Sequence, residues 1–404
     1  MRILILIPLL FASLVVAEDQ PSSRQGEIEN ARKQKAPDLK PNRITGAEEK
    51  YRRINESDLI GRLLGPAIGL GIRFGGLPTG SGFALGPRYY RPDLAGENVV
   101  FKAWAVSSVA KFYQIETSLE MPHLAHDHVT FGLTASRNDS PAIEYYGPGP
   151  RSQESSRTSF RREQTDFHIH AGIRPVRRYL TLGLESGATM LNIGPGKRPG
   201  IPSTDQVFGP AQAPGIQAQT NFARMGPVVT LDFRDLPLDP HKGGLIEAKY
   251  IYYRGLDLDQ FSFQKVSGTF EQYIPFLNEK RVIALRGYTE WNLTDRRHLV
   301  PFYMQATLGG SEELRGYPRF RFHDDNVMAL TSEYRWEVMP ALDMALFGDA
   351  GQVFSKRNTF KWAEMRGAVG AGFRIKSRNA VVMRLDVGAS REGVQVWFKF
   401  GHAF

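Results

Sequence analysis

Histidine is the first side chain in this sequence whose spacing suggests chemistry. His123, His126 and His128 fall within one predicted turn, and His168 and His170 share one face of a predicted strand. Neutral imidazoles at such spacing could bind zinc or nickel. A turn does not fix ligand geometry, however, and no further cluster of carboxylates lies near these histidines in sequence. The sequence therefore predicts neither a metal site nor a cofactor.

Nucleophilic catalysis and nucleotide binding can be weighed in the same way. The chain has no cysteine, which excludes a thiolate nucleophile, a cysteine zinc site and a disulfide scaffold. A membrane hydrolase would need a Ser–His pair on adjacent lipid-facing positions, and the lipid-facing sets described below offer none. Gly69, Gly71 and Gly75 lack the spacing and the following helix of a phosphate-binding loop. We therefore expect that the protein is not an enzyme.

Composition limits the class of protein, and the N-terminus indicates its destination. Of the 404 residues, 23% are charged and 42% hydrophobic, which excludes wholesale disorder and a polytopic helical membrane protein. Residues 1–17 carry Arg2, an apolar run and small residues before Glu18, which is typical of a secretory signal peptide. Residues 18–60 are polar and nearly lack aromatics, so we expect a disordered or partly helical arm. The formal charge of +9 alone does not indicate an anionic partner, and no nucleic-acid partner is expected.

Residues 61–404 alternate between apolar and polar side chains along segments of about ten residues. In the last segment the apolar face holds Val394, Val396, Phe398, Phe400, His402 and Phe404. A period of two, with one apolar face and one charged or glycine face, indicates a sheet between two unlike solvents. Strands of a soluble sandwich average about five or six residues, whereas a tilted strand needs ~9–11 residues to cross a bilayer. The pattern therefore favours a transmembrane β-barrel.

Sixteen such segments can be counted, and an even number suits a bacterial outer-membrane barrel. Their expected starts lie near residues 65, 82, 97, 110, 127, 161, 178, 224, 244, 259, 281, 327, 341, 364, 380 and 393. Long loops follow odd-numbered strands, at about 137–160, 191–223 and 293–326, and most loops after even-numbered strands are short. We therefore predict an all-β fold, a 16-stranded antiparallel transmembrane barrel over 61–404 that closes between its first and last strands.

Several stretches of this barrel carry a resemblance to a known family. They are LGGSEELRGY (308–317), FGDAG (347–351), TSEYRWEVMP (331–340), LDFRDLPLDPHKGG (231–244) and the terminal VWFKFGHAF (396–404). Together, and in the order in which they follow one another along the chain, they resemble the C-terminal barrel of the BamA/TamA-type superfamily of outer-membrane assembly and translocation proteins, the bacterial surface antigen barrels. The resemblance is strongest over 224–404 and thinner over 61–223.

The resemblance implies that the loop bearing Leu314-Arg315-Gly316-Tyr317 folds back into the lumen, where its arginine contacts Glu333 and Asp349 on the two following strands. An arginine inside a partly dry lumen must be paired, and its planar fork can engage two carboxylates at once. Such a cluster could serve function or only brace the loop, and the sequence leaves both roles open. The implied residues are Gly309, Gly310, Leu314, Arg315, Gly316, Tyr317, Glu333, Phe347, Asp349 and Gly351.

Further arginines fall on strand faces assigned to the lumen. They are Arg286, Arg335, Arg366, Arg374 and Arg384. A basic lumen could attract anions or lipid phosphates. We favour pairing instead, with the carboxylates expected on the same wall, which are Glu290, Glu333, Asp343 and Asp386.

In one respect the chain departs from the family pattern. Family members with assembly activity usually carry periplasmic POTRA modules ahead of the barrel, and residues 18–58 are too few for even one such module. We therefore expect a barrel-only member lacking POTRA domains, without POTRA-mediated partners.

Two functions remain open. The first is insertion or translocation of client proteins, or of lipids, in the bacterial outer membrane, through a gated seam between strands 1 and 16 and the loop in the lumen. Outer-membrane or secreted proteins would then be partners, in addition to outer-membrane lipid. The alternative is a passive outer-membrane pore or structural barrel that keeps the family motifs for its stability.

Both ends of the predicted barrel bear on the first function. Gly65, Pro66, Gly69 and Gly71 weaken pairing of the first strand and so weaken the seam, although a merely irregular barrel end would show the same composition. At the other end, Phe398, Phe400 and Phe404 resemble the aromatic-ended strand that is recognised during membrane insertion.

Overall fold

The computed structural model of the chain describes residues 68–75, 77, 81–95, 98–176, 179–277, 280–339, 341–377 and 380–400. These residues belong to one compact unit, Lys50–Phe404. The expected signal peptide (1–17), the expected arm (18–60), residues 61–67 and Phe404 lie outside the described residues.

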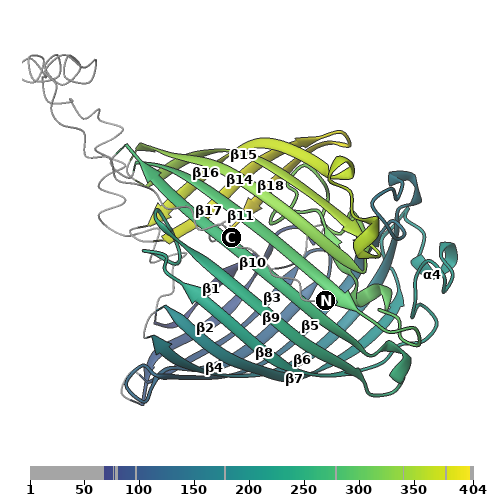
Figure 1. The fold of residues 1–404 in the computed structure, drawn as a ribbon, viewed down its shortest axis with the longest axis horizontal. Helices are drawn as coiled ribbons and strands as arrows, with labels where there is room; N and C mark the ends of the chain where they lie inside the picture. The colour runs from purple at the N-terminus through teal and green to yellow at the C-terminus, as the bar shows by residue number, and fades with distance from the viewer. Residues whose placement is uncertain are drawn as a thin grey trace, which may run out of the picture. The chain divides into compact units, whose positions relative to one another are not determined.

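Sixteen strands form one antiparallel sheet in which each pairs with the next along the chain. The sheet wraps around a common axis as a barrel wall (Figure 1). The predicted fold class and strand number are confirmed, and the predicted starts lie within about four residues of the observed ones. The strands are β1 (Gly69–Phe74), β2 (Ala84–Leu94), β3 (Val99–Ser108), β4 (Tyr113–Leu124), β5 (Val129–Tyr145), β6 (Thr158–Val176), β7 (Leu180–Pro195), β8 (Phe222–Asp232), β9 (Gly243–Gly255), β10 (Phe263–Phe276), β11 (Arg281–Leu293), β14 (Asn326–Met339), β15 (Leu342–Phe354), β16 (Arg366–Ser377), β17 (Ala380–Ser390) and β18 (Gly393–Lys399).

The loops carry a few short elements. They are α4 (Thr204–Val207), the hairpin strands β12 (Ala306–Leu308) and β13 (Phe322–Asp324), and the 3-10 turns η2 (Glu154–Ser156), η3 (Asp259–Phe261), η4 (Phe302–Met304), η5 (Arg357–Thr359) and η6 (Trp362–Glu364). In the described part of the chain, no helix is both long and apolar enough to cross a membrane.

The outer face of the sheet is apolar, and part of the inner face is buried. On β16 the side chain of Val369 is 66% exposed, whereas that of Ala368, one residue earlier, is 4% exposed. On β18 the exposed side chains are Val394, Val396 and Phe398, and Trp397 is buried between them. An apolar belt on the outside of a barrel is the surface that faces lipid.

Two predicted boundaries are wrong because backbone pairing outlasts the apolar pattern. β5, β6 and β7 run for 17, 19 and 16 residues, and Tyr145 still pairs with Thr158. The loops predicted at 137–160 and 191–223 are therefore the shorter segments 146–157 and 196–221. In these extensions the side chains no longer alternate: Asp139 and Ser140 are both buried, and Ile143, Tyr145 and Phe160 belong to a buried hydrophobic cluster. The hydrophobic period therefore stops while the hydrogen-bonded ladder continues.

The last strands also differ in detail from the expectation. A register shift between Ile375 and Lys376 opposes Lys376 to Val381, and the side chain of Val381 is buried. A one-residue shift moves a side chain to the other face of a sheet. β18 ends at Lys399, short of the predicted end at the C-terminus.

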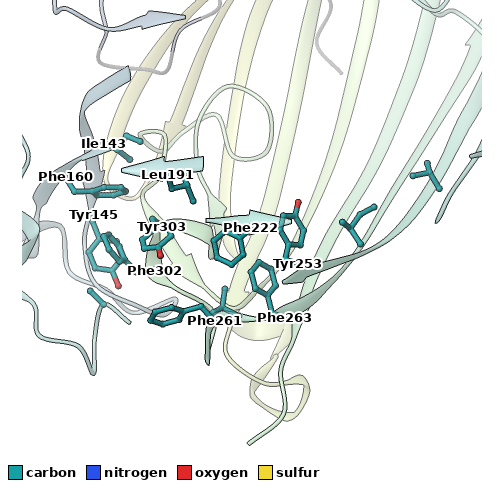
Figure 2. Close-up of a cluster of buried hydrophobic side chains, with 14 residues drawn as sticks. Ile143, Tyr145, Phe160, Leu191, Phe222, Tyr253, Phe261, Phe263, Phe302 and Tyr303 are labelled. Carbon is teal, nitrogen blue, oxygen red and sulfur yellow. The ribbon is translucent and has the colours of Figure 1, made fainter. Parts of the chain in front are cut away.

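Residues 294–325, which we call the lumen loop, bring η4 against the inner faces of β5 to β10. The ring of Phe302 lies 4.8 Å from that of Phe160 and 5.3 Å from that of Tyr145. Phe222 and Tyr253 continue the same buried aromatic cluster on the other side of Tyr303 (Figure 2). The loop is therefore held by a hydrophobic core of its own within the barrel.

At the opposite end of the barrel, the loop 233–242 reaches the strands β16 and β17. Lys376 lies 3.5 Å from Asp239 and 2.9 Å from Asp343, and the amide of Val381 donates to the carbonyl of Leu238 at 3.2 Å. This connection ties β8 and β9 to strands that lie far along the sheet.

Candidate functional site

The lumen loop doubles back at two glycines. Gly309 and Gly310 adopt φ of 120° and 100°, a region that favours glycine, and the amide of Gly310 donates to the carbonyl of Tyr317 at 3.0 Å. A Cβ on Gly309 would lie 2.2 Å from the carbonyl oxygen of Pro318. The segment 310–317 is thus a small loop within the lumen loop whose two ends are hydrogen-bonded to each other, and we call it the excursion. The paired strands β12 and β13 flank its ends.

Arg315 lies at the tip of this excursion and is 2% exposed. Its Nε and Nη2 donate to the two carboxylate oxygens of Asp349 at 2.9 and 2.8 Å, and its Nη1 donates to Glu333 at 2.6 Å. The backbone N–H of Arg315 also donates to Asp349, at 3.0 Å. The guanidinium carbon lies 3.4 Å from the centre of the Phe347 ring, so the cation is stacked as well as bonded.

Three further arginines extend this arrangement into an ion cluster. Glu333 also accepts from Arg335 at 2.8 Å and from Arg374 at 3.0 Å. The other members are Asp386 and Arg384, which lie 3.0 Å apart, and Arg374 also donates to Asp386 at 2.5 Å. The cluster, Arg315, Glu333, Arg335, Asp349, Arg374, Arg384 and Asp386, holds one more guanidinium than carboxylate. Each arginine of the cluster lies within 3.0 Å of at least one carboxylate. Such pairing is the condition under which charged side chains are tolerated away from water.

The backbone of the excursion is bound to the last strands of the barrel. Trp397 of β18 donates from Nε1 to the carbonyl of Arg315 at 2.6 Å, and Ser390 donates to the carbonyl of Gly316 at 2.8 Å. A Cβ on Gly388 would lie 2.4 Å from the carbonyl oxygen of Arg315, and one on Gly316 would lie 2.7 Å from the Cβ of Ala368. Missing side chains on both surfaces therefore permit this close approach.

The remaining predicted residues of the loop and wall form an apolar layer beside the cluster. Leu314 and Tyr317 are 0% and 1% exposed and pack with Leu308 and Phe322. A Cβ on Gly351 would lie 2.8 Å from Leu308. The space beside Gly351 is thus filled by Leu308 of the lumen loop.

The predicted aromatic residues at the C-terminus lie elsewhere. Phe398 is 53% exposed on the outer face of β18, and Phe404 lies outside the described residues. Phe400 meets Phe74 of β1, with ring centroids 5.5 Å apart. The hydrogen-bonded order of the described sheet begins at β1 and ends at β18, so this contact lies at the seam, the junction between β1 and β18.

The other expected ion pairs are partly replaced by different ones. Glu290 and Asp343 pair with Lys265 and Lys376, at 2.7 and 2.9 Å, rather than with arginine. Arg366 donates to the carbonyl of Pro150 at 2.8 Å. Lys265 and Lys376 were missed because only arginines were expected as partners for the carboxylates on the lumen wall.

The histidines at the turn do not come together as ligands. His123 lies 2.6 Å from Asp127, and the Nδ1 of His128 lies 3.2 Å from the carbonyl of Arg174. Within the described ranges, no group of three or more His, Cys, Asp or Glu side chains has a metal-binding arrangement.

Comparisons with known proteins identify a family model that matches the sequence and solved structures that share the fold. A family model described as the Omp85 superfamily domain matches residues 94–404. BamA from Haemophilus ducreyi, solved without POTRA domains 1–3, aligns with a TM-score of 0.59 and 16% identity over 83% of this chain and 70% of that one. CdiB from Escherichia coli aligns with a TM-score of 0.54 and 15% identity over 84% of this chain and 63% of that one. At these identities the likeness shows the fold alone. Among curated proteins, no sequence matches the chain.

Proposed function

The chain belongs to the Omp85 superfamily, and from that membership we propose that it is a bacterial outer-membrane barrel that inserts or translocates client proteins. The activity is mechanical and involves no bond chemistry. The barrel works in outer-membrane lipid, through the seam and the lumen loop, and client proteins are its partners.

The observation that carries this proposal is the attachment of the lumen loop to the last strand. Arg315 connects the ion cluster on β14 and β15 to Trp397 of β18. Because one residue bonds to all three strands, displacement of β18 at the seam strains the loop, and release of the loop frees β18. This coupling suits a barrel that opens sideways better than one that only encloses a pore.

The position of β18 at the seam supports the same proposal. In the described sheet order β1, with six residues, is the first strand and β18 is the last. When two strands of a seam separate, the backbone groups of the freed edge can accept a strand from another chain. A client strand docked there would lie beside Val394, Val396 and Phe398, which face the lipid.

The alternative function, a passive barrel, is distinguished by the reconstitution experiment described below. The lumen loop fills part of the lumen with buried side chains such as Phe302, Leu314 and Tyr317, which argues against a wide permanent pore. A passive barrel would conduct steadily and would not change the folding rate of a client.

Cross-linking of the seam tests the proposal. The chain has no cysteine, so Phe74→Cys/Phe400→Cys can be joined by a short thiol-reactive cross-linker without side reactions. The protein is reconstituted into liposomes, and folding of an added urea-unfolded eight-stranded outer-membrane barrel is scored by its heat-modifiable band shift. We expect the wild type and the unlinked variant to accelerate folding of this probe client, and the cross-linked variant to lose the acceleration.

A second cysteine pair provides the matched control. Val229→Cys/Ala248→Cys joins directly paired residues on the outer faces of β8 and β9, away from the seam in the sheet order. Cross-linking this pair should leave the acceleration unchanged. Full activity of the cross-linked seam variant would refute gating at the seam. Steady single-channel conductance of a wild type that accelerates no client folding would favour the passive barrel.

A further inference from the structure

A cavity lies inside the barrel, and none of the residues that line it belongs to the ion cluster. It has a volume of about 240 Å³ and lies between the inner faces of β5, β6 and β10 and the lumen loop. One side is apolar, with Ile143, Phe160, Phe302, Tyr303, Met304 and Phe320. Several of these side chains belong to the aromatic cluster seen in Figure 2. The other side is polar and includes Arg162, Lys265 and His323.

The two cations that line this cavity differ in their partners. Lys265 lies 2.7 Å from Glu290 and is therefore neutralised. Arg162 forms no ion pair within 4.0 Å and no hydrogen bond within the described part of the chain, and its Nε is buried without a partner. The positive charge of Arg319 also acts on Arg162. The negative charge of Asp166 acts on Arg162 as well, but no carboxylate of the described structure bonds to the guanidinium directly, so its donors are available to an anion in the cavity.

His323 faces the same cavity from β13 and is 2% exposed. Its Nδ1 has no hydrogen-bond partner in the described structure. Burial, together with the nearby charge of Arg162, lowers the pKa of His323 to about 3, so the ring is neutral at pH 7. A neutral imidazole has one N–H, and an acceptor placed at Nδ1 would select the tautomer that donates there.

We propose that this cavity binds a small amphiphilic anion, with a carboxylate or phosphate group between Arg162 and His323 and an apolar part against Phe160, Phe302 and Phe320. Arg162 belongs to the barrel wall, whereas His323, Phe302 and Phe320 belong to the lumen loop. The bound anion would therefore join the loop to β6, on the side of the barrel away from the seam. The proposal does not depend on the proposed function.

Binding is measured by isothermal titration calorimetry on the full chain in detergent. Benzoate and phenyl phosphate present the two anionic groups on the same ring, benzyl alcohol is the neutral analogue, and inorganic phosphate is the anionic group alone. We expect benzoate or phenyl phosphate to bind, with the stronger of the two identifying the anionic group, and benzyl alcohol to bind at least about tenfold more weakly.

Two variants and a control locate the site. Arg162→Gln should weaken binding at least about tenfold, since hydrogen bonds to charged groups are stronger than neutral ones. His323→Phe keeps a ring beside Tyr145 and should weaken binding about threefold or more by removing the Nδ1 donor. Arg254→Gln is the control, because Arg254 is exposed on β9 and has no ion pair among the described residues. It should bind as the wild type does.

A structural readout covers the case in which Arg162→Gln alters the fold. Without ligand, Arg162→Gln should melt at the same temperature as the wild type or higher, because a partly buried cation that has no direct ion pair in the described structure has been removed. The anions should raise the melting temperature of the wild type and of Arg254→Gln more than that of Arg162→Gln. Absence of binding by every probe, equal binding of benzyl alcohol and benzoate, or unchanged affinity in Arg162→Gln and His323→Phe would each overturn the proposal.

Discussion

Arg315→Ala is the substitution that tests most directly how the lumen loop is held. It leaves Glu333 with Arg335 and Arg374, at 2.8 and 3.0 Å, so this carboxylate stays compensated. Asp349 loses both guanidinium hydrogen bonds and keeps the donation from the backbone N–H of residue 315.

The size of the effect follows from this asymmetry. Removing one partner of a buried ion pair costs about 3–5 kcal/mol, because the remaining charge stays desolvated. Since only one of the two carboxylates is left without a cation, we expect the lower end of this range, a loss of about 3 kcal/mol in the free energy of unfolding.

The assay is guanidinium-induced unfolding of the barrel in lipid vesicles, followed by tryptophan fluorescence under conditions where refolding is complete. Arg391→Ala is the matched control. Arg391 lies exposed in the turn between β17 and β18, so its removal should change stability by no more than about 0.5 kcal/mol.

A double substitution separates charge burial from lost packing. Asp349→Asn removes the negative charge that Arg315→Ala leaves without a cation. The loss in the free energy of unfolding of Arg315→Ala/Asp349→Asn should therefore be smaller than the sum of the losses of the two single variants, by about 1–3 kcal/mol. Strict additivity, or a loss below about 0.5 kcal/mol for Arg315→Ala alone, would refute the view that the cluster holds the loop.

Three further predictions concern the same loop. Trp397→Phe should cost about 1–2 kcal/mol by leaving the buried carbonyl of Arg315 without its donor, measured by the same unfolding assay. Gly316→Ala places a Cβ 2.7 Å from that of a neighbouring alanine, so the excursion should lift and become cleavable by added protease, whereas wild-type protein stays intact. Burial and the charge of Glu312 raise the pKa of Glu313 from 4.5 to about 7, so its contribution favours folding at low pH and is lost as pH rises through 7. Glu313→Gln should flatten this pH dependence and stabilise the protein at pH 8, and an unchanged profile between pH 5 and 8 would contradict the assignment.

Strand number and the inward position of the ion cluster could be predicted because both depend on local pattern. A period of two assigns each side chain to a face as soon as the strand is recognised. Glu333 and Asp349 are therefore assigned to the inner face by their apolar neighbours alone. The partner role of Arg315 came from the family resemblance, and the structure places its side chain within 2.6–2.9 Å of both carboxylates.

What the sequence did not disclose depends on approaches between distant segments. No local pattern distinguishes the lumen-facing Trp397, which bonds to the loop, from any other inward side chain. The contact of Leu308 with Gly351 and the ion pair of Lys376 with Asp239 are of the same kind, since each joins separate loops and strands. The lengths of β5 to β7 were missed because their hydrogen-bonded pairing continues where apolar and polar side chains no longer alternate, as the adjacent buried residues Asp139 and Ser140 show.

The attachment of the excursion to the last strand also sets an order of assembly. Arg315 bonds to Asp349 across 34 positions, Gly316 to Ser390 across 74 and Arg315 to Trp397 across 82. Contacts across such separations form late, because the intervening chain must first be ordered. During biogenesis the guanidinium of Arg315 can pair with Glu333 and Asp349 before β16 to β18 are in place. The backbone carbonyl of Arg315 gains its hydrogen bond only when Trp397 of β18 arrives. Addition of the terminal strand thus completes the sheet and fixes the lumen loop in one event. In a chain whose β18 has not yet joined the sheet, the lumen loop therefore lacks its bond to Trp397.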